Sequence, residues 1–358
     1  MGSQGHTLRE IFQQPDLWPT TLERIDAASQ RLGLKTKLGG GRILLTGAGT
    51  SAYAAYAVAA AGPDCLAVPT TDLLIDTERH LAGVGAVISL ARSGGSPESA
   101  AVVERVRALR PKIFQIAITC NPDSALARSA LDGIVFLDPR TNDRSLVMTS
   151  SFSNLVLGGL ALFQRDAIGK AVEICGARAK ALLPEIDRAC RDAAAKVRDR
   201  IVMLSSSPLQ AWGQEAGLKS LEMTAGAHPV VTETFLGLRH GPMSFLRADT
   251  LVLCLLSSDP VRRLYEEDLL RELRAKSIGQ LAGIADPAVE GGLFDAVIPA
   301  VAPHLADALR TPFEIVAPQL FGYHLSLAKG LDPDNPSPGG VINRVVQGVT
   351  IHPARPSR

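Results

Sequence analysis

The segment 84–109 constrains the fold more than any other part of the sequence. Its first part, 84–90, is an apolar run with the length of a buried strand, and its last part, 98–109, has a helical period. A short turn, 92–97, joins them. A strand that passes through a short turn into a helix is the building unit of a parallel sheet covered by helices.

The turn itself has the composition of an anion-binding turn. Gly94 and Gly95 let the backbone approach a ligand closely, and Ser93 and Ser96 supply hydroxyl donors. The first amides of a helix have no partner within the helix, and the helix dipole favours negative charge there. The turn therefore predicts a phosphate site, although an ordinary βα turn with a serine N-cap has the same composition.

The strand–turn–helix unit recurs along the chain. Further strands are expected at 43–45, 66–68, 112–119, 133–137, 200–204, 230–232, 251–256 and 294–298. This rhythm predicts an α/β fold with two domains, each a parallel, flavodoxin-like sheet with helices on both faces.

The expected domain bounds follow from the same pattern. They are an N-terminal helical segment, 1–35, a first domain, 36–190, and a second domain with a C-terminal tail, 191–358. A length of 358 residues also favours two domains. Within the helical connector between them, Pro184 is expected to begin a new helix.

Composition excludes several functional classes. The formal net charge of +1 gives no support to nucleic-acid binding. The sequence has no apolar run of membrane-spanning length and no signal pattern, so a cytoplasmic protein is expected. The five cysteines are scattered and form no C-x-x-C pair, which favours a reducing compartment and predicts no metal site.

A second glycine-rich turn offers an alternative function. Segment 47–52 reads G-x-G-x-x-A, the dinucleotide fingerprint, and Asp72 lies near the place where a ribose-binding acid is needed. However, Thr50 and Ser51 suit a sugar phosphate, and a dinucleotide site needs only one such turn. We therefore favour phosphate binding at this turn too, with a third Ser/Thr turn at 149–151.

The candidate catalytic groups lie in the second half of the chain. Glu215, Lys219 and Glu222 share one face of a predicted helix, 209–225. Such a trio is commonly an exposed salt-bridge ladder, but this helix has few other charges. His240 follows in a turn bounded by glycine and proline, where an imidazole beside a carboxylate and a lysine suits acid–base chemistry.

The sequence resembles the sugar isomerase (SIS) family, and within it the AgaS type with two SIS domains. The resemblance covers almost the whole chain and rests on segments 45–51, 70–73, 91–99, 119–122, 141–145, 148–152, 238–242 and 343–350. The family includes the isomerase half of glucosamine-6-phosphate synthase. That synthase carries a glutaminase domain with a cysteine after the initiator Met, where this chain has Gly2, so glutamine-dependent synthesis is not expected.

The resemblance implies a substrate-binding set and a catalytic set. The residues expected to bind the phosphate or sugar are Gly49, Thr50, Ser51, Arg92, Ser93, Gly94, Ser96, Thr149, Ser150 and Gln347. Gln347 stands where the synthase has a lysine that forms a Schiff base, so imine catalysis by this residue is not expected. Arg92 replaces a neutral residue and adds a bidentate phosphate donor.

In the catalytic set, the resemblance makes Glu222 the base that moves a proton between C1 and C2, supported by Glu215 and Lys219. His240 would open the sugar ring and would come from the neighbouring subunit of a homodimer. A carboxylate suits this role best when partial burial raises its pKa. The chemistry needs neither a metal nor an organic cofactor.

The expected reaction is conversion of galactosamine 6-phosphate to tagatose 6-phosphate and ammonia. The alternatives are glucosamine-6-phosphate deaminase and simple ketose/aldose phosphate isomerase. A non-catalytic sugar-phosphate regulator is a further alternative, but residues 1–40 are too short and poorly patterned for a helix-turn-helix. A regulator would also not need Glu222 and His240.

Overall fold

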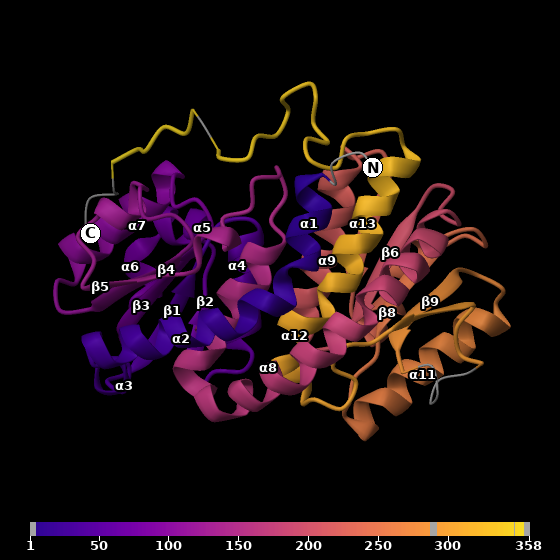
Figure 1. The fold of residues 1–358 in the computed structure, drawn as a ribbon, viewed down its shortest axis with the longest axis horizontal. Coiled ribbons are helices and arrows are strands. Elements are labelled where there is room, and N and C mark those ends of the chain that lie inside the picture. Colours follow the sequence, from indigo (N-terminus) through magenta and orange to yellow (C-terminus); the bar gives the residue numbers. More distant parts are fainter. Residues whose placement is uncertain (1–4, 287–291, 347, 354–358) are drawn as a thin grey trace. The chain divides into compact units, whose positions relative to one another are not determined.

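The computed structural model describes residues 5–286, 292–346 and 348–353. Within these residues, ten strands form two parallel sheets of five strands each (Figure 1). The first sheet has the order β2-β1-β3-β4-β5, with β1 Arg42–Thr46, β2 Cys65–Ala67, β3 Val84–Ala91, β4 Phe114–Thr119 and β5 Gly133–Phe136. The second has the order β10-β9-β8-β6-β7, with β6 Ile201–Ser205, β7 Val230–Glu233, β8 Leu251–Leu255, β9 Gln280–Ala285 and β10 Ala296–Pro299.

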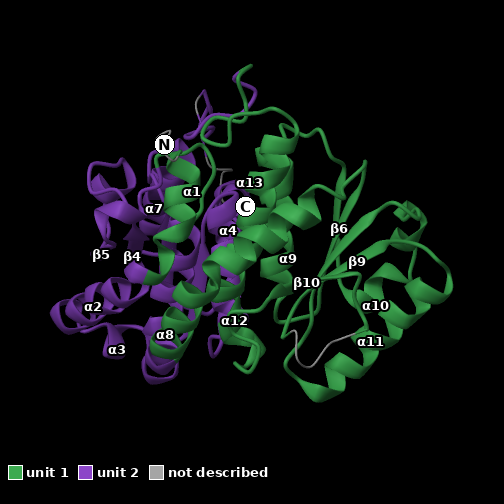
Figure 2. Cartoon of the chain, turned by 45° about the vertical axis from the view of Figure 1, so that its right-hand side comes forward, with its two compact units in different colours: residues 1–15, 144–149, 171–339 green, residues 16–143, 150–170, 340–358 purple. Residues whose placement is uncertain are grey.

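The chain divides into two compact units, each built from separate pieces of sequence (Figure 2). The first-sheet unit contains residues 16–143, 150–170 and 340–358, and the second-sheet unit contains 1–15, 144–149 and 171–339. This division differs from the expected bounds in three respects: the C-terminal tail groups with the first sheet, the N-terminal helical segment is split between the units, and residues 144–149 and 171–190 of the expected first domain group with the second sheet.

Helices cover both faces of the first sheet, because its strands carry apolar side chains on both sides. The helices of this unit are α2 Gln14–Leu32, α3 Leu34–Lys37, α4 Thr50–Ala59, α5 Thr70–Ile75, α6 Thr77–His80, α7 Pro97–Leu109 and the first part of α8, Ser150–Ala194. On one face, Val102 and Val106 of α7 pack on Leu44 and Val87 of the sheet. On the other, α8 approaches Ile118 of β4.

The second sheet is covered in the same way. Its helices are α1 His6–Phe12, α9 Gln210–Met223, α10 Phe235–Leu238, α11 Pro260–Ala275, α12 Asp307–Glu314 and α13 Val316–Ala328, with the later part of α8. Leu269 and Leu273 of α11 pack with Val252 and Cys254 of β8 in one core cluster. Short 3-10 turns lie at Leu126–Arg128, Pro139–Thr141 and Pro242–Phe245.

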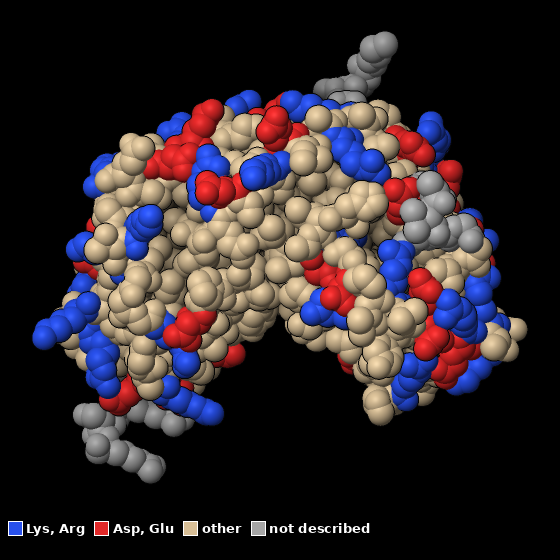
Figure 3. Space-filling view, turned by 90° about the horizontal axis from the view of Figure 1, so that it is seen from below, with Lys and Arg blue, Asp and Glu red and all other residues tan. Residues whose placement is uncertain are grey.

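The predicted fold class is confirmed, and nine of the ten described strands overlap predicted segments. The prediction that Pro184 begins a helix is wrong, because Pro184 lies inside α8, and the helical backbone is interrupted at Gln164 instead. No helix of the described residues is long and apolar enough to cross a membrane. On the face drawn in Figure 3, Lys and Arg side chains are interspersed with Asp and Glu.

Candidate functional site

Two turns meet at the carboxyl edge of the first sheet. From β1 the chain passes to β2 on one side, whereas β3 pairs with β1 on the other side. Ligands of open parallel sheets bind at such a switch point. Thr50 and Ser51 open α4 there, and the turn 92–96 leads into α7.

Close packing sets the shape of both turns. A Cβ atom on Gly47 would lie 2.5 Å from the carbonyl carbon of Ser51, so only glycine fits between β1 and α4. Gly94 has a φ of +56°, and a Cβ there would lie 2.5 Å from Ser124 Oγ. Asn121 Nδ2 donates to the Ser93 carbonyl oxygen at 3.0 Å. The predicted phosphate turn is therefore held by the loop that follows β4.

Arg92 links this turn to the C-terminal tail. Its side chain is buried, and Nη2 donates to the Arg344 carbonyl oxygen at 2.6 Å. The Arg344 guanidinium in turn donates to the Asp143 carbonyl oxygen from Nε at 2.8 Å and to Asn142 Oδ1 from Nη2 at 2.6 Å. Because of these bonds, the tail is clamped beside the phosphate turn within the first-sheet unit.

The tail also packs directly on the turn. A Cβ on Gly95 would lie 3.3 Å from Val345 Cγ1, so the backbone of the turn and the tail are in close contact. The tail therefore brings the residues that precede Gln347 to the candidate phosphate site. Gln347 itself lies outside the described residues.

The third predicted Ser/Thr turn is occupied by a carboxylate of the chain. Asp143 accepts hydrogen bonds from the backbone N–H groups of Ser150 at 3.1 Å and Ser151 at 2.9 Å, and from both hydroxyls. Asp143 is fully buried, and it satisfies the first amides of α8. Thr149, also buried, precedes the helix, and its carbonyl oxygen accepts from Gln319 Nε2 at 3.1 Å.

The three charged residues of α9 do not form an exposed ladder. The side chains of Glu215 and Lys219 are fully buried, and that of Glu222 is 23% exposed. Lys219 Nζ lies 3.2 Å from Glu215 Oε1 and 2.6 Å from Glu222 Oε2. Burial lowers the pKa of Lys219, but the two carboxylates outweigh this and raise it, so the ammonium stays protonated at neutral pH.

The packing of α9 explains why these charges share one face. At 100° per residue, Gly213 and Gly217 lie opposite the charged trio. Both glycines contact the sheet closely, since a Cβ on Gly213 would lie 2.6 Å from Ser205 Oγ and one on Gly217 would lie 2.4 Å from Thr232 Cγ2. The charged face is therefore directed away from the sheet, toward the side on which α13 packs against α9.

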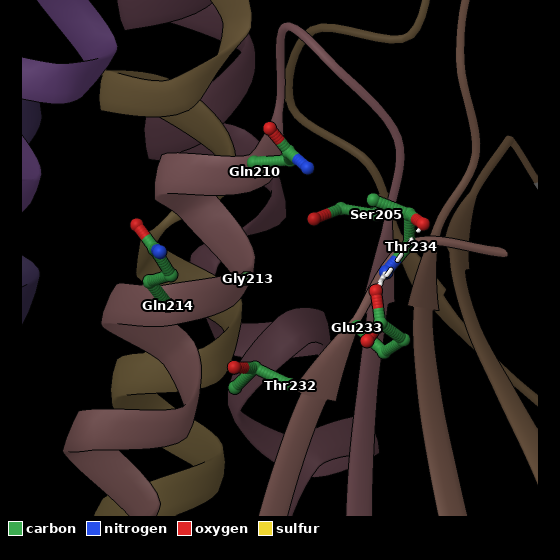
Figure 4. Close-up of a pocket in the computed structure, with 7 residues that line it drawn as sticks. All are labelled: Ser205, Gln210, Gly213, Gln214, Thr232, Glu233 and Thr234. Carbon is green, nitrogen blue, oxygen red and sulfur yellow. Dashed lines mark hydrogen bonds between the residues drawn. The ribbon is translucent and has the colours of Figure 1, made fainter. Parts of the chain in front are cut away.

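A small polar pocket lies between α9 and β7 (Figure 4). Its volume is about 180 Å³, and its lining includes Gln210, Gln214, Thr232 and Glu233. These α9 residues belong to the sheet-facing side of the helix rather than to the charged face. The pocket is also smaller than the usual ~300–1,000 Å³ of a small-molecule site. It is therefore separate from the acid–base cluster.

His240 lies in the turn after α10 and is exposed. Arg239 Nε donates to Glu272 Oε2 of α11 at 2.7 Å, which anchors this turn to the second-sheet unit. In the part of the chain that the structure describes, no hydrogen bond or ion pair joins His240 to Glu222. The described residues also contain no group of three or more His, Cys, Asp or Glu side chains that could hold a metal ion.

The sequence was compared with known proteins. A D-galactosamine-6-phosphate deaminase AgaS of Shewanella sp. (strain ANA-3) is 35% identical over 370 residues, which are 97% of this chain and 92% of that protein. A Streptomyces coelicolor protein with the same name, given provisionally, is 36% identical over 98% of this chain and 96% of its own length. This chain belongs to the AgaS family. No family model matches the sequence.

Solved structures agree with membership of the AgaS family. The tagatose-6-phosphate ketose/aldose isomerase of Escherichia coli is 32% identical, with a TM-score of 0.87 over 99% of this chain and 98% of that one. The C-terminal domain of the glucosamine-fructose-6-phosphate aminotransferase of Francisella tularensis has a TM-score of 0.73 at 19% identity, which shows a shared fold. The predicted resemblance to the AgaS type is confirmed.

Three residues of the candidate site were not predicted. Asn121, Asp143 and Arg344 shape or clamp the turns through hydrogen bonds. All three lie in segments that carried the family resemblance, 119–122, 141–145 and 343–350. Those segments were the available signal, but only the folded chain shows which groups each residue contacts.

Proposed function

We propose that this AgaS-family chain converts galactosamine 6-phosphate to tagatose 6-phosphate and ammonia. The names of its full-length relatives support the substrate and the reaction. The observation that carries the mechanism is the α9 cluster, in which a buried lysine pairs with a buried carboxylate and a half-buried one, Glu222. Only Glu222 is positioned to reach a substrate from this cluster.

The phosphate group would bind at the carboxyl edge of the first sheet. Thr50 and Ser51 at the start of α4 and Ser93 and Ser96 in the next turn supply hydroxyl and amide donors. The buried Arg92 belongs to the same turn as Ser93 and Ser96 and adds positive charge there. Phosphate recognition by these turns would leave the sugar carbons extending out of the edge of the sheet.

The chemistry is a proton transfer followed by hydrolysis. His240 assists opening of the ring, and Glu222 removes the C2 proton of the open-chain amino aldose, which gives an enolamine. Glu222 returns the proton to C1, so that the double bond moves to C2=N. Water adds to this ketimine and ammonia leaves, which gives the 2-ketose. Lys219 stays protonated and holds the Glu222 carboxylate in place.

A homodimer with a shared site is part of the proposal. His240 is exposed, and among the described residues no hydrogen bond or ion pair joins it to Glu222; both observations support a role in the site of a partner subunit. The five cysteines, all free thiols, support a cytoplasmic location.

Simple isomerisation is the second candidate, because the Escherichia coli structure carries the name of a ketose/aldose isomerase. One experiment separates the candidates. The protein is incubated separately with galactosamine 6-phosphate and glucosamine 6-phosphate, and both ammonia and ketose phosphate are measured over time. Equal release of ammonia and tagatose 6-phosphate from the first substrate is expected. A third incubation uses galactose 6-phosphate, the aldose that isomerises to tagatose 6-phosphate. Ketose formed from this aldose phosphate, with no ammonia from either amino sugar, would contradict the deaminase.

A further inference from the structure

The two sheets have the same connectivity. Read from the β7 end, the second sheet has the order β7-β6-β8-β9-β10, which matches β2-β1-β3-β4-β5 of the first. The turn between β8 and α11, 256–259, therefore takes the place of the phosphate turn between β3 and α7, 92–96. Both turns contain serines, and both helices begin with a proline, Pro260 and Pro97.

In the second sheet, a carboxylate of the chain lies at this turn. Asp307 Oδ1, from the first residue of α12, accepts from the Ser258 N–H at 2.8 Å and from its hydroxyl at 3.0 Å. The Ser257 hydroxyl donates to Oδ2. Arg310 Nη1 lies 3.2 Å from Oδ1. A backbone amide, two hydroxyls and a guanidinium are the donors that a protein offers to a phosphate group.

Asp307 is not needed to cap α11. Asp259 already accepts hydrogen bonds from the backbone N–H groups of Val261 at 3.0 Å and Arg262 at 2.9 Å. The Asp307 carboxylate instead lies on the preceding serines, and Arg262 Nη1 is 3.5 Å from its Oδ2. The turn therefore binds two carboxylates. Asp259 caps α11, and Asp307 lies in a separate set of donors.

Two further observations indicate space and unused donor capacity beside this turn. A pocket of about 480 Å³ is lined by Ser258, Arg263 and Arg310, among others. Arg310 is only 2% exposed, and its Nε has no hydrogen-bond acceptor among the residues that the structure describes. The pocket therefore leaves room for an ion larger than a carboxylate beside Ser258 and Arg310.

The corresponding turn of the first sheet, 92–96, differs in whether a carboxylate of the chain accepts from its serines. In the described part of the chain, no carboxylate accepts a hydrogen bond from Ser93 or Ser96. The donors of one turn are thus occupied by an acid of the chain, and those of the other are not. This difference distinguishes two turns that the topology makes equivalent.

We infer that Asp307 takes the place of a phosphate group in the second sheet, so that each chain binds one sugar phosphate and loss of the Asp307 side chain opens a second oxyanion site. The comparison rests on the proposed phosphate turn at 92–96. The second site would take a tetrahedral oxyanion such as inorganic phosphate, held by Ser257, Ser258 and Arg310.

The test counts bound phosphate per chain by equilibrium dialysis and isothermal titration calorimetry with inorganic phosphate. Wild type is expected to bind one phosphate and Asp307→Ala two. Ser93→Ala with Ser96→Ala removes the proposed first site. In that background, no bound phosphate is expected when Asp307 is present, and one is expected with Asp307→Ala. These last two phosphate counts do not depend on the turn 92–96, so they test the inference even if the proposed function fails.

Two control variants separate charge replacement from general loosening. Asp307→Asn keeps the volume and one acceptor oxygen, so it should still fill the turn and gain no phosphate. Glu314→Ala removes the other carboxylate that contacts Arg310, at 3.3 Å, without touching the serines, so it should also gain none. A phosphate gained by Glu314→Ala as readily as by Asp307→Ala would overturn the inference.

Stability gives a second readout if Asp307→Ala unfolds easily. A ligand that binds only the folded protein raises the midpoint of thermal unfolding. At ~20 times its Kd, the gain in the free energy of unfolding is large enough to measure. Addition of phosphate to about 20 mM should therefore raise the midpoint of Asp307→Ala by several degrees more than that of wild type. Equal shifts for the two proteins, or an unchanged phosphate count in folded Asp307→Ala, would refute the inference.

Discussion

Lys219 Nζ lies 2.6 Å from Glu222 Oε2, and the lysine side chain is fully buried whereas the glutamate is 23% exposed. A buried ammonium is stable only when carboxylates compensate its charge, and Glu215 supplies the second one. The pair therefore connects the core of the second-sheet unit to its surface. In the proposed mechanism, it fixes the position of the group that moves the proton.

Replacement of Lys219 by methionine is the first prediction. The change keeps much of the side-chain volume but leaves Glu215 buried without its cation, so the free energy of unfolding should fall by roughly 3–5 kcal/mol. Urea unfolding measures this, and the kcat of the folded fraction should also fall. The double variant Glu215→Gln with Lys219→Met should recover part of the stability. No recovery would show that the two residues do not interact.

The phosphate turn gives the second prediction. Arg92→Ala with Ser93→Ala should raise the KM for the sugar phosphate tenfold or more, because each lost charge-assisted bond contributes roughly 1.5–3 kcal/mol. Arg344→Ala should raise KM less and should leave kcat near the wild-type value, since Arg344 acts through the tail. Arg79→Ala, which changes an arginine of α6, is the matched control. Unchanged kinetics in the double variant would contradict the turn assignment.

The third prediction concerns Glu222 and His240. Glu222→Gln should abolish turnover while binding of sugar phosphate persists, because the amide keeps the shape but cannot accept the C2 proton. His240→Asn should slow turnover of the cyclic substrate, on the scale of ~10²–10⁴ for lost acid–base catalysis. It should slow an open-chain substrate much less.

Mixing these two inactive proteins tests whether a site is shared between subunits. In a heterodimer, one site would receive both wild-type residues. Random exchange would restore at most about a quarter of the sites, since about half of the dimers are mixed. Recovered activity is expected after exchange has been verified by mass spectrometry. Inactivity of the verified heterodimers would show that each site is built within one chain.

The fourth prediction is an acid dependence of stability that arises from Asp307. Burial raises the pKa of this carboxyl, but hydrogen bonds from Ser257 and Ser258 and the charge of Arg310 outweigh burial and lower it below 3.8. A lowered pKa stabilises the fold above the unfolded value, and this contribution is lost as the pH falls through the folded pKa. The difference in unfolding free energy between wild type and Asp307→Asn should be constant from pH 7 to about 5 and shrink below about 4.

The fifth prediction concerns metal ions. Exhaustive dialysis against EDTA should leave turnover unchanged, because the proposed proton transfers use only side chains of the chain. The measurement compares the initial rate of ammonia release before and after dialysis. Activity that disappears with the chelator and returns on addition of a divalent cation would overturn this mechanism.

The sequence alone predicted the local units of the fold well. Apolar runs such as 84–90 and 251–256 have enough β-branched and leucine residues to indicate buried strands, and Gly/Ser turns mark their ends. The exception was β9, Gln280–Ala285, whose glycine, Gly283, weakens the strand pattern. Gly283 is there because the Phe294 ring fills the place of a Cβ, 2.3 Å away, and that contact is tertiary.

Spacing along a helix placed Glu215, Lys219 and Glu222 on one face, since helical period is a local property. Whether that face is exposed or buried depended on the approach of α13, which the sequence does not encode locally. In the same way, the Ser/Thr turns 92–96, 149–151 and 256–259 are alike in sequence. Asp143 and Asp307 occupy the donors of their turns from 7–8 and 49–50 residues away, whereas no described carboxylate accepts from Ser93 or Ser96. Hydrogen-bond donors look the same in any sequence; only the folded chain decides which of them meet an acid of the protein and which are left for a ligand.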